Sequence, residues 1–306
     1  MLLAACAATE PRDSGTAAPL AMAEPQQEAF SAFAAAPELP EERPAGRSLQ
    51  PAAWAPPPAL RDLPVPSVSA AAAVVLDEAS GAVLYEKQGD VRLPIASLTK
   101  IATAMAVLES GIPLDTVVTV DVDSRLMRGS SVMGLHAGDR FTVRDLLYGL
   151  MLHSGNDAAL ALARAVDGSD AAFVERMNGL VRRLGLENTH FVDPHGLASR
   201  NHYSTAHDLA LLARYAMANP VFAELARADR WMAYGSREIP LENVNTFLQY
   251  PGADGVKTGF TYRAGRTLVA SATRDGRRLL AVLLNAPQRD EDAAALLDWA
   301  FAAVGY

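Results

Sequence analysis

Residues 1–66 and residues 67–306 differ sharply in composition, and this change most limits how the chain can fold. Twelve of the nineteen prolines and eighteen alanines lie in residues 1–66, where no apolar period of 2 or 3.6 residues persists. The three consecutive prolines at 56–58 favour extended polyproline geometry with a solvated backbone. We therefore expect residues 1–66 to form a semi-stiff linker and residues 67–306 to form one α/β domain of ordinary size.

The overall composition and charge exclude several classes of protein. Half of the residues are hydrophobic and a fifth are charged, which rules out wholesale disorder, collagen and a polytopic membrane protein. The formal net charge is -8, whereas nucleic-acid binding needs a clustered positive field. The chain has no basic stripe, so we expect no nucleic-acid partner.

The single cysteine, Cys6, excludes an intrachain disulfide framework and a cysteine-built zinc site. The run Leu3-Ala4-Ala5-Cys6 resembles the lipobox of bacterial lipoproteins, in which the cysteine is lipidated. A signal peptide needs about 7–15 apolar residues before the cleavage site, but only five residues precede Cys6. Either the true start lies upstream and Cys6 is the lipidation site, or the match is a coincidence and the thiol is inert. No other stretch is long and apolar enough to span a bilayer, so we expect membrane contact only through this N-terminal lipid anchor.

Strands are predicted at both ends of residues 67–306. Apolar, β-prone runs occur at 70–76 and 82–85, and again at 267–273 and 278–284. The second pair flanks Asp275-Gly276, the strongest short hairpin signal in the chain. We expect strands from the two ends to pair with one another, because pairing hides their edges.

Between these strands the apolar residues recur with helical spacing. Thr142 precedes one helix and Asp145 follows three residues later, the pattern of a capping box. The expected helices cover 97–108, 143–153, 157–166, 170–184, 205–217 and 221–228, and 290–303 closes the chain. The sequence thus predicts an α/β fold with a mainly antiparallel sheet built from N- and C-terminal strands, flanked by helices, with an inserted all-helical lobe. Since one helix follows the last hairpin, we expect no additional β-domain or C-terminal anchor.

Lysine is rare in this chain, and its positions are the first indication of chemistry. Twenty-four of the 27 basic residues are arginine, and only Lys87, Lys100 and Lys257 are lysine. Arginine cannot accept a proton near neutrality, whereas burial lowers the pKa of a lysine by several units. A base on a long stem would therefore have to be a lysine. Codon bias with three surviving lysines is the alternative, and we adopt it for Lys87 on a predicted hairpin.

Ser97 and Lys100 stand three residues apart at the start of a predicted helix. Residues at this spacing share a face, so the hydroxyl and the amine would be neighbours. The positive end of the helix dipole favours an alkoxide and disfavours an ammonium, which shifts the two groups towards nucleophile and base. A serine and a lysine at this spacing also recur by chance in many proteins.

Two further short motifs lie downstream. The Ser-Gly-Asn run at 154–156 lies between two predicted helices and, taken alone, is an N-capped turn. The Lys-Thr-Gly run at 257–259 lies in a β-prone segment before the final hairpin. Its lysine could supply positive charge to a substrate carboxylate, and its glycine would let a substrate backbone approach closely. An ordinary strand with a solvated lysine is the alternative.

Together the three motifs read Ser-x-x-Lys, Ser-x-Asn and Lys-Thr-Gly, the order found in class A β-lactamases and penicillin-binding proteins. Their local context resembles the low-molecular-mass penicillin-binding proteins, the serine D-alanyl-D-alanine carboxypeptidases, over roughly residues 67–304. The runs that carry this resemblance are 94–100, 152–159 and 255–261, with 190–197 and 202–206 in support.

The resemblance implies a catalytic role for four residues. Ser97 would attack the carbonyl between two terminal D-alanines of a peptidoglycan stem peptide, and Lys100 would take its proton. Ser154 would relay a proton to the leaving amine, and Asn156 would hold the substrate backbone.

The resemblance assigns substrate binding to the third motif and its surroundings. Lys257 and Thr258 would bind the terminal carboxylate, and Gly259 would admit the substrate backbone. The oxyanion would lie between the backbone N–H groups of Ser97 and Phe260, and removing one such donor typically costs about 3–4 kcal/mol of barrier stabilisation.

Two more expectations concern the charges of the site. Arg289 is expected to add a second cation for the substrate carboxylate, although a charged residue at a helix start explains it equally well. A fixed cation at Lys257 is expected to help keep Lys100 neutral by like-charge repulsion.

Several alternatives compete with this assignment. The histidines between residues 190 and 208 suggest a zinc peptidase, but no His-Glu-x-x-His pair or cysteine ligand set occurs, so we expect no metal and no organic cofactor. A β-lactamase would add a glutamate in a Glu-x-x-Leu-Asn context, which is missing, so bound penicillin should be released slowly. A receptor module without turnover stays open, although none of the motifs is broken.

We expect a secreted, lipid-tethered enzyme that acts outside the cytoplasmic membrane. Its expected partners are peptidoglycan stem peptides, with β-lactam antibiotics as covalent inhibitors. A D,D-endopeptidase that cuts cross-links is the second alternative, because it would use the same centre as a carboxypeptidase.

Overall fold

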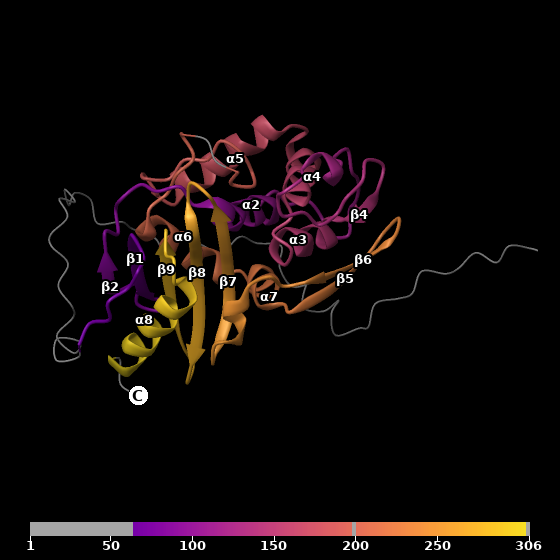
Figure 1. Ribbon diagram of the computed structural model, residues 1–306. Coiled ribbons are helices and arrows are strands. Elements are labelled where there is room, and N and C mark those ends of the chain that lie inside the picture. The colour runs from indigo at the N-terminus through magenta and orange to yellow at the C-terminus, as the bar shows by residue number, and fades with distance from the viewer. Residues whose placement is uncertain (1–63, 198–199, 304–306) are drawn as a thin grey trace, which may run out of the picture. The chain divides into compact units, whose positions relative to one another are not determined.

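The computed structural model describes residues 64–197 and 200–303. Its centre is a five-stranded antiparallel sheet with the strand order β2-β1-β9-β8-β7 (Figure 1). The strands are β1 Ala72–Asp77, β2 Val83–Lys87, β7 Ala253–Thr261, β8 Gly265–Arg274 and β9 Arg277–Leu284. N-terminal and C-terminal strands meet where β1 pairs with β9, with Val74 opposite Val282. The predicted hairpins and their shared sheet are therefore confirmed.

The local sequence explains the order of this sheet. Asp275 and Gly276 take the tight turn between β8 and β9 with φ values of 44° and 80°, a conformation that glycine adopts freely and aspartate tolerates. Every residue of β1 is buried, as expected for an apolar strand with neighbours on both sides. Strand β7 ends the strand order and is thus an edge strand of this sheet.

Helices cover both faces of the sheet. Helix α8 (Arg289–Ala303) lies in front of the sheet in Figure 1, and its Leu296 and Phe301 belong to the same buried cluster as Val75 of β1. Helix α6 (Ala206–Met217) lies behind the sheet and contacts β9 and β1. The predicted helical flanks are confirmed.

The lobe inserted between β2 and β7 is mainly helical. Its helices are α2 Thr99–Leu108, α3 Val143–Met151, α4 Asn156–Asp167, α5 Asp170–Arg183 and α7 Pro220–Arg227. The predicted capping box is present at α3, where the Thr142 hydroxyl accepts from the Asp145 N–H and the carboxylate accepts from the Thr142 N–H. Among the described residues, no helix has the length and apolar character needed to cross a membrane.

The fold class is confirmed with one correction, because the inserted lobe is not wholly helical. It also contains two two-stranded sheets. These sheets are β3 Val117–Thr119 with β4 Arg140–Thr142, and β5 Arg230–Tyr234 with β6 Glu238–Glu242. Three-residue strands are too short to show a period of 2, and β6 contains Pro240, which strands accept mainly at edges.

The described residues begin close to the predicted boundary between residues 66 and 67. Val68 is already buried in the cluster under α8. Residues 1–63, with Cys6 among them, lie outside the described residues, so the linker and the lipidation site stay predictions.

Candidate active site

A cleft of about 430 Å³ lies between strand β7 and the helical lobe. It brings together most of the residues singled out in the sequence. Those that line it are Ser97, Ser154, Asn156, Thr258, Gly259, Phe260 and Arg289. The other two residues of the three motifs, Lys100 and Lys257, are buried. Motifs far apart in the chain therefore meet at one site.

Ser97 lies in a short 3-10 turn, η2 (Ala96–Leu98), directly before α2. The sequence placed it inside the helix, which in fact begins at Thr99. In a 3-10 turn the side chains at i and i+3 eclipse one another, so the predicted proximity survives this shift. Ser97 Oγ lies 3.0 Å from Lys100 Nζ.

Oxygen atoms surround the amine of Lys100. Besides Ser97 Oγ, Nζ lies 2.7 Å from Asn156 Oδ1 and 2.9 Å from the backbone oxygen of His195. Burial lowers the pKa of Lys100 well below its usual value, and the positive charge of Lys257 lowers it further. Lys100 therefore stays uncharged at pH values where a solvated lysine is an ammonium.

The turn between α3 and α4 carries Ser154 and Asn156. Ser154 is buried and has a φ of 56°, which lets the chain reverse before Asn156 opens α4. The neighbouring Asp157 carboxylate accepts the backbone N–H groups of residues 133–135. These bonds hold a loop whose residues 129–131 form part of the cleft wall. Sequence reasoning missed this wall, since an acidic residue in the first turn of a helix is an ordinary feature.

Strand β7 forms the opposite wall. A Cβ atom at Gly259 would lie 2.9 Å from the backbone nitrogen of Ser97 and 2.6 Å from Thr267 Oγ1. Only glycine allows β7 to approach η2 this closely. The close approach at Gly259 was predicted for a substrate backbone, and in the structure it brings Ser97 against strand β7.

Lys257 is buried on β7, and its amine donates to the backbone oxygen of Thr258 at 3.1 Å. Burial, followed by the positive charge of Arg289, lowers the pKa of Lys257 to about 7. The expectation of a fixed cation is therefore corrected, because the charge of Lys257 changes near neutral pH. Arg289 lies at the start of α8, donates to Asp290 at 3.0 Å and lines the cleft.

Sequence reasoning also missed the carbonyl of His195 as a partner of Lys100. The only signal was its place in the run 190–197, one of those that carried the family resemblance. Among the described residues, one group could supply three metal ligands: the imidazole of His207 lies 3.0 Å from Asp90 and 3.4 Å from Glu86. None of these three residues lines the cleft. The expectation of no metal stays a prediction.

Comparison with known proteins places this geometry in a family. Residues 61–288 match the family described as D-alanyl-D-alanine carboxypeptidase. The chain is 41% identical over 249 residues to D-alanyl-D-alanine carboxypeptidase DacC of Escherichia coli (strain K12), covering 77% of this chain and 62% of that protein. It is 39% identical over 250 residues to DacB2 of Mycobacterium tuberculosis (strain ATCC 25618 / H37Rv), covering 78% and 85%. The crystal structure of the Streptomyces K15 DD-transpeptidase matches with a TM-score of 0.73 at 35% identity, over 78% of this chain and 98% of that one.

The fold is that of the Streptomyces K15 DD-transpeptidase, as the sequence predicted. The chain belongs to the D-alanyl-D-alanine carboxypeptidase family, which confirms the resemblance drawn from its motifs. It spans 62% of the length of DacC and 62% of the length of the D-alanyl-D-alanine carboxypeptidase DacF of Bacillus subtilis (strain 168).

Proposed function

We propose that this protein is a serine-type D-alanyl-D-alanine carboxypeptidase that removes the terminal D-alanine from peptidoglycan stem peptides. One observation carries the proposal: the buried amine of Lys100 contacts the Ser97 hydroxyl and two further oxygens. A neutral amine has two N–H groups and one lone pair. Asn156 Oδ1 and the carbonyl of His195 can only accept, so they take the two N–H groups and the lone pair faces Ser97. Lys100 is then ready to receive the Ser97 proton.

The acylation step follows from this arrangement. Ser97 Oγ attacks the carbonyl carbon of the penultimate D-alanine while its proton moves to Lys100 Nζ. The oxyanion lies between the backbone N–H groups of Ser97 and Phe260. The C–N bond then breaks, and Ser154 relays the proton from Lys100 to the leaving nitrogen of the terminal D-alanine. An ester on Ser97 remains.

Deacylation uses the same groups. Water attacks the ester carbon and gives a proton to Lys100, which returns it to Ser97 Oγ as the C–O bond breaks. The shortened stem peptide leaves as a carboxylic acid, which loses its proton to solvent, and the free enzyme is restored. A β-lactam forms the same kind of ester, and no loop glutamate of the β-lactamase type is present in the sequence to speed its hydrolysis.

Substrate binding is assigned to β7 and Arg289. An extended peptide can add to an edge strand through backbone hydrogen bonds. The terminal carboxylate lies beside Lys257, Thr258 and Arg289, with Asn156 holding the substrate backbone. A bound carboxylate favours the charged form of Lys257 and so opposes the effect of burial on its pKa.

The proposal includes a setting for the enzyme. Family membership and the lipobox-like run ending at Cys6 support action outside the cytoplasmic membrane, with a lipid on Cys6 and residues 1–66 as the tether. The partners are then peptidoglycan stem peptides, and β-lactam antibiotics act as covalent inhibitors.

Labelling of the purified protein with a fluorescent penicillin tests the proposal. We expect one covalent label on Ser97, none in Ser97→Ala, and normal labelling of Ser110→Ala, a serine outside the cleft. The unlabelled enzyme should release D-alanine from a pentapeptide stem. A wild-type protein that takes no label would overturn the acyl-enzyme, and labelling without D-alanine release would favour a receptor module.

Mass spectrometry of digested muropeptides separates the two peptidase activities. A carboxypeptidase shortens stems by one alanine, whereas an endopeptidase converts cross-linked dimers into monomers. We expect the loss of one alanine. If dimers were converted into monomers while the pentapeptide stems stayed intact, the enzyme would be an endopeptidase and not a carboxypeptidase.

A further inference from the structure

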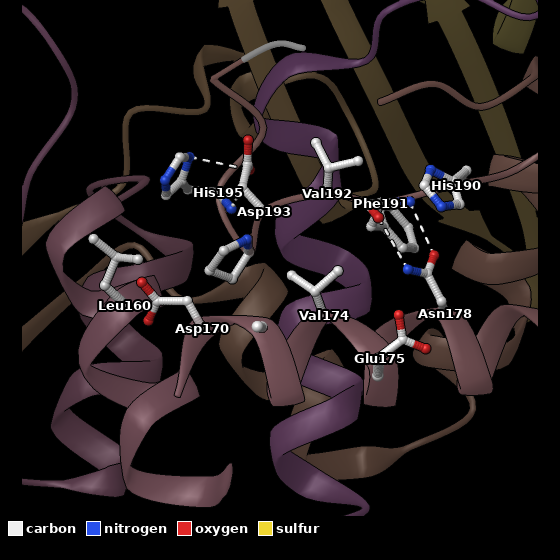
Figure 2. Close-up of a pocket in the computed structure, with 12 residues that line it drawn as sticks. Leu160, Asp170, Val174, Glu175, Asn178, His190, Phe191, Val192, Asp193 and His195 are labelled. Carbon is white, nitrogen blue, oxygen red and sulfur yellow. Dashed lines mark hydrogen bonds and ion pairs between the residues drawn. The ribbon is translucent and has the colours of Figure 1, made fainter. Parts of the chain in front are cut away.

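The run 190–196, which contributes only the His195 carbonyl to the proposed mechanism, lies directly behind the nucleophile. Its backbone is fixed from several sides: Asn178 bonds both the N–H and the carbonyl of Phe191, and Thr103 of α2 donates to the carbonyl of Pro194 at 2.6 Å. Residues 190–195 line a surface cavity of about 510 Å³. Figure 2 shows side chains of this segment there, with the Asn178 bonds and the contact of Asp193 with His195. The segment is therefore a rigid support behind α2.

His202 connects this support to the nucleophile turn. Its ring is buried, its Nδ1 accepts the backbone N–H of Val192 at 3.3 Å, and its Nε2 lies 2.7 Å from Thr99 Oγ1. Because Nδ1 accepts, the ring proton of the neutral imidazole is on Nε2 and is donated to Thr99. The Thr99 hydroxyl keeps its own proton for the carbonyl oxygen of Ala96 at 2.8 Å. These bonds form a directed chain from Val192 to Ala96.

The carbonyl of Ala96 belongs to the same planar peptide unit as the N–H of Ser97. Fixing the oxygen on the rear side therefore fixes the direction of that N–H on the cleft side. The unit needs such support, since Ala96 has a φ of 50°, in the sparsely populated left-handed region. The same oxygen also accepts the backbone N–H of Thr99.

Two glycines enclose this peptide unit. A Cβ atom on Gly196 would lie 1.9 Å from the Ala96 oxygen and 2.8 Å from Thr99 Oγ1. On the other side Gly259 of β7 lies against the nitrogen of Ser97, as described above. The run 190–196 and strand β7 therefore contact the same peptide unit from opposite sides. The Thr99 hydroxyl donates the side-chain hydrogen bond that orients this unit.

We propose that His202 and Thr99 are positioning residues that orient the Ala96–Ser97 peptide, so that the Ser97 N–H points at the oxyanion. The inference rests on the proposed function, because it assigns a purpose to the N–H of a serine that must become acylated. Burial lowers the pKa of His202 to about 4, although Asp193, with a carboxylate oxygen 3.9 Å from Nδ1, opposes this. The neutral ring that the chain of bonds requires is thus the form present across the neutral range.

Thr99→Val tests the inference, because it keeps the shape of the side chain and removes the hydroxyl. Thr99→Ser restores the hydroxyl and should rescue the function. Thr103→Val is the matched control, because it too removes a buried threonine hydroxyl of α2. The Thr103 hydroxyl donates to the carbonyl of Pro194 and not to the carbonyl next to Ser97. All three proteins are acylated with a penicillin carrying a ¹³C label at its reactive carbonyl.

The first readout is the acylation rate constant at saturating penicillin. Loss of a full oxyanion donor costs on the order of 100-fold or more, so partial misalignment should slow Thr99→Val about tenfold. Thr99→Ser and Thr103→Val should stay within about twofold of wild type, on the same scale. The second readout is the infrared stretch of the labelled ester carbonyl, which an oxyanion hydrogen bond lowers. It should move to higher wavenumber only in Thr99→Val.

Equal rates and equal carbonyl frequencies in Thr99→Val and Thr103→Val would overturn the inference, while wild-type acylation would leave the proposed function standing. If the wild-type protein itself is not acylated, the proposed function is wrong. Should Thr99→Val not fold, the pair His202→Gln and His202→Asn carries the test. Glutamine can place an N–H near the position of Nε2 and should keep the wild-type frequency, whereas asparagine is too short and should raise it. Equal frequencies in that pair would also overturn the inference.

Discussion

The N-terminal end of α2 and the middle of β7 each bury one lysine, yet they surround it differently. Lys100 meets three oxygens from three separate segments, whereas the amine of Lys257 donates to the backbone carbonyl of the next residue. Burial lowers the pKa of both lysines. The comparison teaches that burial lowers the pKa of a lysine in either setting, and that the partners of the amine decide its use. In the proposed mechanism two obligate acceptors leave Lys100 a lone pair directed at Ser97, whereas Lys257 keeps N–H groups for a ligand.

The same substitution at both lysines should have very different effects on the acylation rate. Lys100→Arg replaces an uncharged amine by a permanent cation that cannot accept a proton, so the acylation rate should fall about 1000-fold, within the usual range for a general base. Lys257→Arg keeps a cation for the carboxylate and should lose about tenfold or less on the same scale. Stopped-flow acylation by a fluorescent penicillin measures both, with Lys87→Arg as the control. Similar losses at both positions would contradict the division into base and binding cation.

The contact between Ser97 and Lys100 was predictable from the sequence because one turn of chain sets the distance between them. That local geometry survives even though the helix begins two residues later than expected. The strands at the two ends were predictable for a similar reason, since Asp275-Gly276 and the apolar runs specify their own hairpins.

What the sequence could not supply are contacts between distant segments. The carbonyl of His195 reaches Lys100 across 95 positions of chain, and the loop at 129–131 is held by Asp157. A backbone carbonyl has no residue signature, and a capping carboxylate looks alike whether it binds its own helix or another loop. The pKa of Lys257 near 7 was hidden too, because it depends on burial and on Arg289 at the start of another helix.

The binding role of Lys257 should appear as a dependence on the substrate carboxylate. Lys257→Ala leaves that carboxylate without its buried partner, and kcat/KM for a D-Ala-D-Ala peptide should fall roughly 100-fold. The same peptide with an amidated C-terminus should already be a poor substrate and should lose little more in the variant. Steady-state assays of D-alanine or D-alaninamide release give both values. An equal fall in kcat/KM for the acid and the amide peptide would show that Lys257 does not bind the substrate carboxylate.

The coupling between the two lysines should appear in the pH profile. The charge of Lys257 lowers the pKa of Lys100, so Lys257→Ala should raise that pKa and move the onset of acylation to higher pH. A shift of about half a pH unit to one unit is expected for a nearby like charge in a buried site. We expect the shift on the acid side of the pH profile, because Lys257 is charged only below its own pKa of about 7. Rates of penicillin acylation from pH 5 to pH 9 test this, with Lys87→Ala as the control, and an unchanged onset would leave burial as the only cause.

The last effect concerns folding, and it follows from the same depressed pKa. An unfolded lysine keeps its proton up to about pH 10.5, whereas folded Lys257 releases it at about pH 7. Between these values the unfolded chain binds more protons, so the free energy of unfolding rises with pH and is lowest below pH 7. From pH 7 to pH 9 the contribution is about 2 kcal/mol. Lys257→Met has no proton to lose, so urea unfolding should show a slope against pH that is shallower by this amount, while Lys87→Met should follow the wild type. Parallel slopes for Lys257→Met and wild type would mean that Lys257 remains charged in the folded enzyme, and that the two buried lysines differ in charge as well as in partners.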